Sequence, residues 1–222
     1  MPQPVKQTQP PIEPWPLRHL VLRTPRLTLR PDDDAGLYEL AALAVCGIHP
    51  PDEMPFAHPW TDQASDDLVR GTVQHSWAAR AQLSPSDWRV GFLVRHGGRV
   101  IGVQDLSAKN FAITRQVSTG SWLGSAHQRL GFGTEMRAAV LLLAFDHLGA
   151  TAARSGAYVD NPASLRVSAK LGYRSDGANT WARRGVAVTE IRLVLAAEEF
   201  VRPEWTLDVA GLDGCRELLG AV

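Results

Sequence analysis

Residues 119–148 read TGSWLGSAHQRLGFGTEMRAAVLLLAFDHL and combine a short apolar segment, a glycine-bearing turn and a helical pattern. The apolar residues of the pattern recur at the helical period, which predicts a helix with one buried face. This face comprises Met136, Ala139, Val140, Leu143 and Ala144. We therefore expect the chain to be organised around this strand, turn and helix.

The turn that precedes this helix has the chemistry of an anion site. Gly131 and Gly133 lack a β-carbon, so a phosphate can approach the main chain closely. The first amides of a helix have no internal partner, and the helix dipole favours negative charge there. The turn therefore predicts a pyrophosphate site, the alternative being a tight strand-to-helix turn that holds no ligand.

Two common phosphate-binding turns do not match this sequence. A P-loop would end in Gly-Lys-Ser/Thr, whereas here the chain continues Gly133-Thr134-Glu135 without a lysine. A dinucleotide-binding turn would need a third glycine at Met136, where a large side chain stands. The loop chemistry thus disfavours a nucleotide-binding protein.

The pattern in residues 128–133 resembles the Q/R-x-x-G-x-G/A loop of the GNAT superfamily of N-acetyltransferases. A second segment, residues 158–173, resembles the stretch N-x-x-S-x-x-V-x-x-K-x-G-F/Y found in RimJ/RimL-type ribosomal-protein acetyltransferases. The resemblance spans about residues 20–195. It implies that the loop binds the pyrophosphate of acyl-CoA. The implied binding residues are Leu123, Gln128, Arg129, Leu130, Gly131, Phe132, Gly133, Thr134, Asn161 and Ser164.

The order of predicted elements indicates an α/β (α+β) fold. An acidic run at residues 32–34 predicts the start of a helix that runs to about Val45, and residues 66–82 predict a second helix. Gly97-Gly98 predicts a hairpin between two strands. These elements would form a mixed, mostly antiparallel sheet with helices on both faces. The resemblance further implies the GNAT fold, in which strands 4 and 5 splay apart and the acyl thioester lies in the opening.

Composition sets the domain organisation and excludes several functions. Residues 1–16 carry six prolines and predict a flexible arm. Residues 17–196 predict the acyltransferase domain, and residues 197–222 a C-terminal extension that could make a homo-oligomer contact.

Lysine plus arginine equals aspartate plus glutamate, at 23 each, so no global field attracts nucleic acid. The two cysteines have neither disulfide nor metal-ligand spacing, and no apolar run predicts a membrane span. We expect a cytoplasmic protein without a metal.

The leaving thiolate of CoA needs a proton, and the resemblance suggests which residue supplies it. Many family members use a tyrosine at the position where this chain has Ser168. In RimJ/RimL-type members the serine that follows the asparagine by three residues is proposed instead, and here that residue is Ser164. Ser164 could alternatively serve only in helix N-terminal hydrogen bonding. Asn161 is expected to contact the pantetheine arm and to cap the helix.

The acceptor amine must lose a proton to a general base near the thioester. Three residues are candidates: Asp105 at the end of a strand, Glu190 in the last hairpin, and His127 beside the loop. Most isolated acidic residues are solvated surface groups, so the choice among the three stays open at this point.

The expected reaction is direct attack of a primary amine on the donor in a ternary complex, the amine being a protein N-terminus, a lysine or a small molecule. Acetyl-CoA is the family's usual donor. The segments TRQVSTGSWLG, DNPAS and PPDEMPFAHPW resemble an actinobacterial subgroup that includes succinyl-CoA-dependent members. A succinyl carboxylate would need a cation, for which Arg154, Arg183 and Arg184 are candidates, although they could equally be surface charges. A non-catalytic acyl-CoA sensor is the other hypothesis.

The loop at residues 47–61 has two interpretations of equal weight. It carries four prolines together with Phe56 and Trp60, and in the family this region forms one wall of the acceptor cleft. Alternatively, Met54, Phe56 and Trp60 only cover the core.

Overall fold

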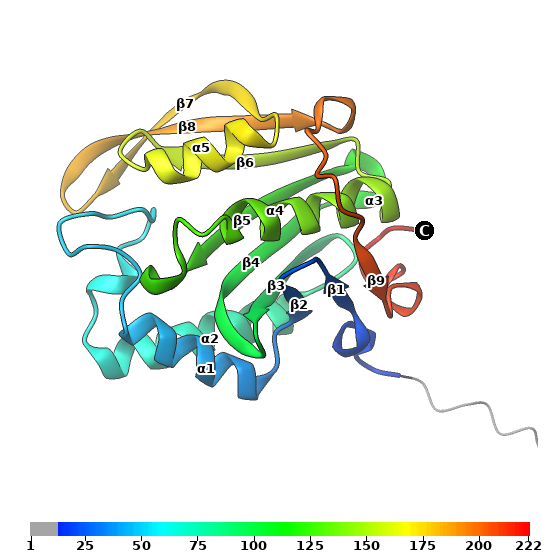
Figure 1. Ribbon diagram of the computed structural model, residues 1–222, viewed down its shortest axis with the longest axis horizontal. Coiled ribbons are helices and arrows are strands. Elements are labelled where there is room, and N and C mark those ends of the chain that lie inside the picture. The colour runs from blue at the N-terminus through cyan, green and yellow to red at the C-terminus, as the bar shows by residue number, and fades with distance from the viewer. Residues whose placement is uncertain (1–12) are drawn as a thin grey trace, which may run out of the picture.

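The computed structural model describes residues 13–222 as one open nine-stranded sheet in the order β7-β8-β6-β5-β4-β3-β2-β1-β9 (Figure 1). Every neighbouring pair is antiparallel except β5 and β6. This confirms the predicted α/β fold. The strands are β1 (Val21–Arg23), β2 (Thr28–Pro31), β3 (Asp87–His96), β4 (Arg99–Lys109), β5 (Gln116–Leu123), β6 (Ala152–Tyr158), β7 (Arg174–Arg183), β8 (Val186–Ala196) and β9 (Asp208–Ala210).

The helices begin and end close to where the sequence predicts. Asp33 caps the first helix by accepting a 2.8 Å hydrogen bond from the Gly36 amide, and Gly172 follows α5 with a positive φ of 95°. The main helices are α1 (Asp34–Val45), α2 (Ser65–Gln82), α4 (Phe132–Leu142) and α5 (Pro162–Lys170), with the short α3 (Phe111–Thr114) between β4 and β5. In residues 13–222, no helix is both long and apolar enough to span a membrane.

Helices cover both faces of the sheet. α1 and α2 pack on one face, where Leu37, Leu40 and Val73 meet Leu93 of β3. α4 and α5 pack on the other face and contribute to the main core, and all five predicted apolar positions of the α4 segment are buried. Apolar residues on successive β4 positions therefore point alternately toward the two helical layers.

The sheet opens between β5 and β6, so that β7, β8 and β6 lie on one side of the opening and the other six strands on the other side (Figure 1). The two parallel strands pair only over residues 116–118 and 152–154. Beyond these pairs β5 follows β4, whereas β6 follows β8. Ser155 Oγ donates a 3.2 Å hydrogen bond to the Thr119 carbonyl where the strands begin to separate. The resemblance implies a splay between strands 4 and 5, whereas in this chain the strands that separate are β5 and β6.

The chain termini add to the sheet edge and core. β9 pairs with β1, and Leu212, Cys215 and Leu219 after it are buried in the main core. Of the predicted arm at residues 1–16, residues 1–12 lie outside the described part of the chain, while Trp15 packs against the main core. The boundaries at residues 16 and 196 stay predictions.

Candidate functional site

The start of α4 has the features of an anion site. Gly131 stands at its N-cap with a φ of 84°, a conformation that favours glycine. Across the described residues, no side chain caps the amides of the first turn. Gly131 is exposed and Gly133 and Thr134 are partly exposed, so the turn is open to solvent. The predicted phosphate site is therefore accessible at the surface.

Among the other predicted loop residues, some hold the loop against the rest of the fold and others lie exposed beside it. Gln128 Nε2 donates to the carbonyls of Ile48 at 2.7 Å and Leu123 at 2.9 Å, so its side chain fixes the loop to the end of β5. Phe132 is buried, with its ring centroid 4.7 Å from that of His96. Arg129 and Leu130 are exposed beside the turn. These are placements only, and the binding roles of all these residues stay predictions.

Glu135, in the first turn of α4, ties the loop to the β1–β2 turn. Its carboxylate accepts hydrogen bonds from Thr24 Oγ1 at 2.6 Å, the Arg26 amide at 3.1 Å and Arg26 Nε at 2.7 Å. Arg26 Nη1 in turn donates to the Leu130 carbonyl at 3.0 Å. Glu135 is therefore a structural anchor of the predicted phosphate turn as well as a favourable charge at a helix N-terminus.

Replacing Gly133 with aspartate tests the phosphate site with little effect on folding, and alanine, which the G/A pattern of the loop admits here, is the matched control. A Cβ at this position would lie 3.7 Å from Val167 and 3.9 Å from Leu123, which are ordinary contacts. The carboxylate of an aspartate in the first turn favours the helix but repels a phosphate at the same amides. We expect Gly133→Asp to melt like the wild type and to bind acetyl-CoA at least about tenfold more weakly, or ~1.4 kcal/mol, by calorimetry, whereas Gly133→Ala binds it like the wild type. Unchanged affinity in Gly133→Asp would contradict the placement.

Two glycines border the opening at corresponding positions of its two strands. Gly120 and Gly156 each lie two residues beyond the last β5–β6 pair, Ser118 with Arg154. Since parallel strands present matching residues on the same face, both glycines face the same side of the sheet. Neither glycine carries a side chain, so side chains of the neighbouring strands can lie over both positions.

A carboxylate stands over each of these glycines, and both were predicted base candidates. Asp105 Oδ2 lies 3.8 Å from the Cβ position of Gly120, and the Glu190 carboxylate carbon lies 2.9 Å from that of Gly156. Glu190 accepts hydrogen bonds from Trp181 Nε1 at 2.9 Å and Asn179 Nδ2 at 3.3 Å. The structure therefore brings Asp105 and Glu190 to opposite borders of one opening.

The two carboxylates differ in their partners. Asp105 forms a charged hydrogen bond with Arg89, so a proton on Asp105 would disrupt an ion pair. Glu190 receives only neutral donors and pairs with no cation in the part of the chain that the structure describes. Of the two carboxylates, only that of Asp105 is therefore held by a cation among the described residues. His127 lies in the short 3₁₀ turn Ser125–His127 before the phosphate loop, away from these glycines in the chain.

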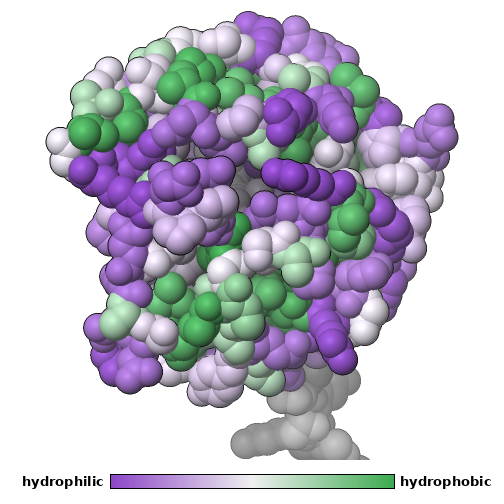
Figure 2. Space-filling model, turned by 60° about the vertical axis from the view of Figure 1, so that its left-hand side comes forward, coloured by the Kyte–Doolittle hydropathy of each residue, from purple (hydrophilic) through white to green (hydrophobic). Residues whose placement is uncertain are grey.

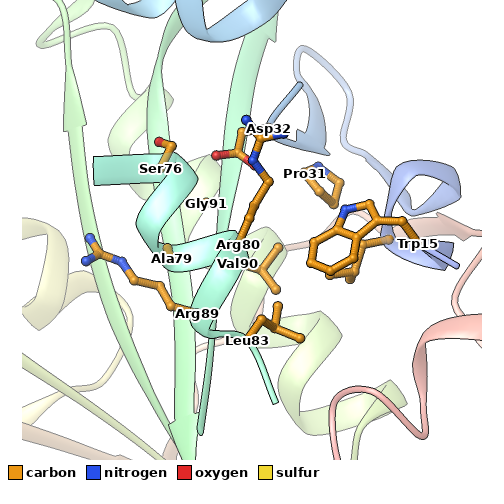
Figure 3. A pocket seen from close by; sticks show the side chains of 11 residues that line it. Trp15, Pro31, Asp32, Ser76, Ala79, Arg80, Leu83, Arg89, Val90 and Gly91 are labelled. Carbon is orange, nitrogen blue, oxygen red and sulfur yellow. The ribbon is translucent and has the colours of Figure 1, made fainter. Parts of the chain in front are cut away.

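A small cavity lies beside Asp32, and neither Gly120 nor Gly156 lines it. It has a volume of about 10 Å³ and is bordered by Trp15, Leu83 and Val90 on one side and by the Asp32–Arg80 pair on the other (Figure 3). A space of that size holds about one water molecule. Asp32 lies in its wall, with Arg80 Nε 3.6 Å from its carboxylate.

Burial raises the pKa of Asp32 to about 6, against opposition from Arg80 and from a hydrogen bond with Ser76, whereas the ordinary value is 3.8. Because the folded pKa lies above the unfolded one, stability falls as pH rises from about 4 to about 6. We expect Asp32→Asn to be the more stable protein at pH 7, by at most ~3 kcal/mol, and to lose this advantage below about pH 4. Urea unfolding across this pH range measures the difference, and a constant difference would contradict the assignment.

α5 places Asn161, Ser164 and Ser168 along one side. Asn161 Oδ1 caps the helix by accepting from the Ser164 amide at 3.1 Å. Ser164 is partly exposed, whereas Ser168 is buried and donates to the Ser164 carbonyl at 3.0 Å. Ser168 also accepts a hydrogen bond from Arg137 Nη1 at 2.9 Å. The predicted cap is confirmed, and the exposed hydroxyl of this pair is that of Ser164.

The arginines considered for an acyl carboxylate are engaged elsewhere. Arg154 forms an ion pair with Asp176 at 2.7 Å. Arg183 is buried, lies 4.5 Å over the Tyr158 ring, and donates to the Met54 carbonyl and to Asp160. Arg184 Nε donates to Asp62 at 2.8 Å. Arg183 and Arg184 thus attach the loop at residues 47–61 and the segment after it to the β7–β8 hairpin.

This attachment places an aromatic row beside the opening. His49, Phe56, Trp60 and Trp122 follow one another with ring centroids 5.8, 5.2 and 5.8 Å apart, and Trp122 belongs to β5. Phe56 and Trp60 also pack against the buried cluster around Ile48. The loop therefore covers part of the core. When the left side of Figure 1 is turned forward, a hollow is visible between polar groups on this face (Figure 2).

Sequence patterns alone do not single out Arg137. It is 4% exposed on α4, and its Nη2 donates to Ser121 Oγ of β5 at 3.2 Å. The available signal is that Glu135 and Arg137 are the only charged residues in the otherwise uncharged run 130–145. A buried charged side chain needs an ion-pair or hydrogen-bond partner, and one without such a partner suggests a functional role.

Comparison with known proteins agrees with this geometry. The family model described as Acetyltransferase (GNAT) domain matches residues 26–174, which include the phosphate turn and α5. RimJ from Mycobacterium smegmatis, solved in complex with CoA-disulfide, has a TM-score of 0.67 at 17% identity over 90% of this chain and 94% of that chain. Spermidine N-acetyltransferase from Vibrio cholerae, solved with CoA and spermine, has a TM-score of 0.58 at 16% identity over 79% and 98%. These likenesses demonstrate a shared fold.

Proposed function

The chain belongs to the acetyltransferase (GNAT) domain family and is an N-acetyltransferase that uses an acyl-CoA co-substrate, and from this premise we propose its donor, acceptor and base. The donor is acetyl-CoA. The acceptor is a primary amine, namely a protein N-terminus, a lysine or a small molecule. The amine attacks the thioester directly in a ternary complex.

The proposal rests on two features that β5 connects. One is the start of α4, whose first amides no side chain among the described residues caps, and the other is the opening between β5 and β6 that Gly120 and Gly156 border. The α4 amides offer a site for the pyrophosphate. From there β5 runs back through Leu123 to Gly120, at the edge of the opening. An extended pantetheine arm laid along β5 would bring the thioester to Gly120 and Gly156, where Glu190 can take the proton of the amine.

The ion pairs of three candidate arginines favour acetyl over succinyl. Arg154, Arg183 and Arg184, any of which could bind a succinyl carboxylate, are held by Asp176, Asp160 and Asp62. Binding an acyl carboxylate there would require breaking one of these pairs. A neutral acetyl group requires no such rearrangement, although succinyl-CoA is the alternative donor that the experiment below includes.

The acceptor class follows from the acidic border of the opening. Glu190 and the aromatic row that ends at Trp122 offer a carboxylate and apolar surface to an amine with an attached chain. The spermidine N-acetyltransferase of the same fold was solved with spermine, a polyamine. We propose Ser164 as the hydroxyl nearest the departing sulfur, because it is the partly exposed serine of α5.

Thiol release tests this proposal. The purified chain is supplied with acetyl-CoA or succinyl-CoA and, in turn, with spermidine, lysine and peptides that have free N-termini. We expect turnover with acetyl-CoA and at least one amine, and little turnover with succinyl-CoA. Tight acetyl-CoA binding without thiol release in the presence of any of these amines would favour the sensor hypothesis. Faster thiol release from succinyl-CoA than from acetyl-CoA would reverse the choice of donor.

A further inference from the structure

Arg137 is a buried cation without a carboxylate partner. It is 4% exposed, and its guanidinium donates to two neutral hydroxyl groups, Ser168 Oγ at 2.9 Å and Ser121 Oγ at 3.2 Å. Its Nε is buried and has no hydrogen-bond partner. Over residues 13–222, no aspartate or glutamate forms an ion pair with it.

Burying an unpaired charge opposes folding. Burial lowers the pKa of the Arg137 guanidinium and Tyr173 opposes this effect, yet arginine keeps its proton in proteins. Gln104 Oε1 is also buried without a partner, and Gln104 is the β4 neighbour of Ser121. An open donor and an open acceptor on adjoining elements indicate that this polar site is incomplete without a further group.

The position of Arg137 relates it to the reacting end of the donor. A Cβ on Gly133 would contact Leu123 and Val167, so the phosphate turn adjoins the end of β5 and α5. Ser121 lies between Leu123 and Gly120 on β5. An arm that runs from the turn to the opening therefore passes the backbone of Ser121, whose side chain is on the α4 face of the sheet, where Arg137 is hydrogen-bonded to it.

We propose that Arg137 stabilises the CoA thiolate as it leaves. This inference rests on the proposed function. The amine nitrogen forms a bond to the acyl carbon, the C–S bond breaks, and its electron pair stays on sulfur as a thiolate. The proton lost from nitrogen passes to Glu190 and then to water. The thiolate, held by the guanidinium, takes a proton from water as CoA departs.

The Arg137 cation assists catalysis because the negative charge it meets forms only during the reaction. An acetyl thioester is neutral, so Arg137 gains little from it in the ground state. The negative charge appears on sulfur as the C–S bond breaks, and a fixed cation then stabilises the transition state selectively. Ser121 and Ser168 hold the guanidinium in place. The titratable groups around it are Tyr173, whose pKa burial raises, and Glu135, which is occupied by Arg26.

Ionisation of bound CoA tests the proposal without turnover. The ultraviolet absorbance of the thiolate is followed against pH for CoA bound to the wild type, Arg137→Met and Arg137→Lys, with desulfo-CoA as the matched ligand without a thiol. In the wild type we expect the pKa of the bound thiol to fall roughly one to three units below that of free CoA. Arg137→Met abolishes the fall, and Arg137→Lys keeps part of it.

Kinetics supply the second readout. Arg137→Met lowers kcat about 10²–10³-fold, while the affinity for acetyl-CoA stays close to that of the wild type because the thioester is neutral. Removing a buried charge often leaves a fold intact. If Arg137→Met does not fold, Arg137→Lys and the double variant Ser121→Ala, Ser168→Ala, which frees the guanidinium, must show reduced kcat and a smaller thiol shift.

Three results would overturn the proposal. The bound thiol could ionise as free CoA does in the wild type, or Arg137→Met could keep full kcat. Alternatively, the wild type could prefer succinyl-CoA and lose that preference in Arg137→Met, which would assign the cation to an acyl carboxylate. Failure of the proposed function is distinguishable, because it would appear as no thiol release in the wild type while the thiol titration still reports on Arg137.

Discussion

Glu190→Gln is expected to lower kcat about 10²–10⁴-fold at neutral pH, because it removes the group that accepts the proton of the amine. The amide oxygen can still accept hydrogen bonds from Trp181 and Asn179, so the fold and the β7–β8 hairpin should be retained. Steady-state thiol release at neutral pH measures this effect.

Asp105→Asn is the matched control for this prediction. It makes the same chemical change on the other border of the opening, next to Gly120. Its main effect should be the loss of a partly exposed ion pair with Arg89, with most of kcat retained. A full rate with Glu190→Gln together with a large loss in Asp105→Asn would transfer the role of base to Asp105.

Glu135→Ala is expected to destabilise the fold by about 2–4 kcal/mol, because it leaves several donors around a buried position without an acceptor. The lost partners are Thr24 Oγ1 and both the amide and the guanidinium of Arg26. The estimate lies below that for a fully buried pair because Arg26 is 46% exposed. Urea unfolding of the variant and the wild type measures the difference.

Glu135→Gln separates the charge from the geometry. The amide keeps one acceptor oxygen near Thr24 and Arg26 but removes the ion pair and the negative charge in the first turn of α4. We expect an intermediate loss of stability. Because Arg26 also holds the Leu130 carbonyl, both variants should bind acetyl-CoA more weakly. Wild-type stability in Glu135→Ala would contradict the role of Glu135 as an anchor.

Local patterns allowed much of the fold to be predicted. The buried face of α4, the turn at Gly97-Gly98, and the cap at Asn161 each depend on residues close together in the sequence. The phosphate turn belongs to the same class, since Gly131 adopts the positive φ that its lack of a Cβ permits.

Features that depend on distant segments could not be predicted. Glu135 meets a partner 109 residues away, Arg26. The matching of Gly120 with Gly156 requires the β5–β6 register, which no local pattern specifies. Arg137 becomes notable only once α5 and β5 enclose it. The hydrogen bond of Arg183 to the Met54 carbonyl and the ion pair of Arg184 with Asp62 likewise depend on how the loop at residues 47–61 and the segment after it fold against the β7–β8 hairpin.

The central claim is that the first amides of α4 bind the pyrophosphate of acyl-CoA. Calorimetric titration of the wild type with acetyl-CoA and with S-acetylpantetheine, which lacks the pyrophosphate and the nucleotide, tests it most directly. We predict measurable binding of acetyl-CoA that Gly133→Asp weakens, and binding of S-acetylpantetheine that is far weaker and insensitive to this substitution. Equal affinities for the two ligands, or no affinity for acetyl-CoA, would contradict the claim.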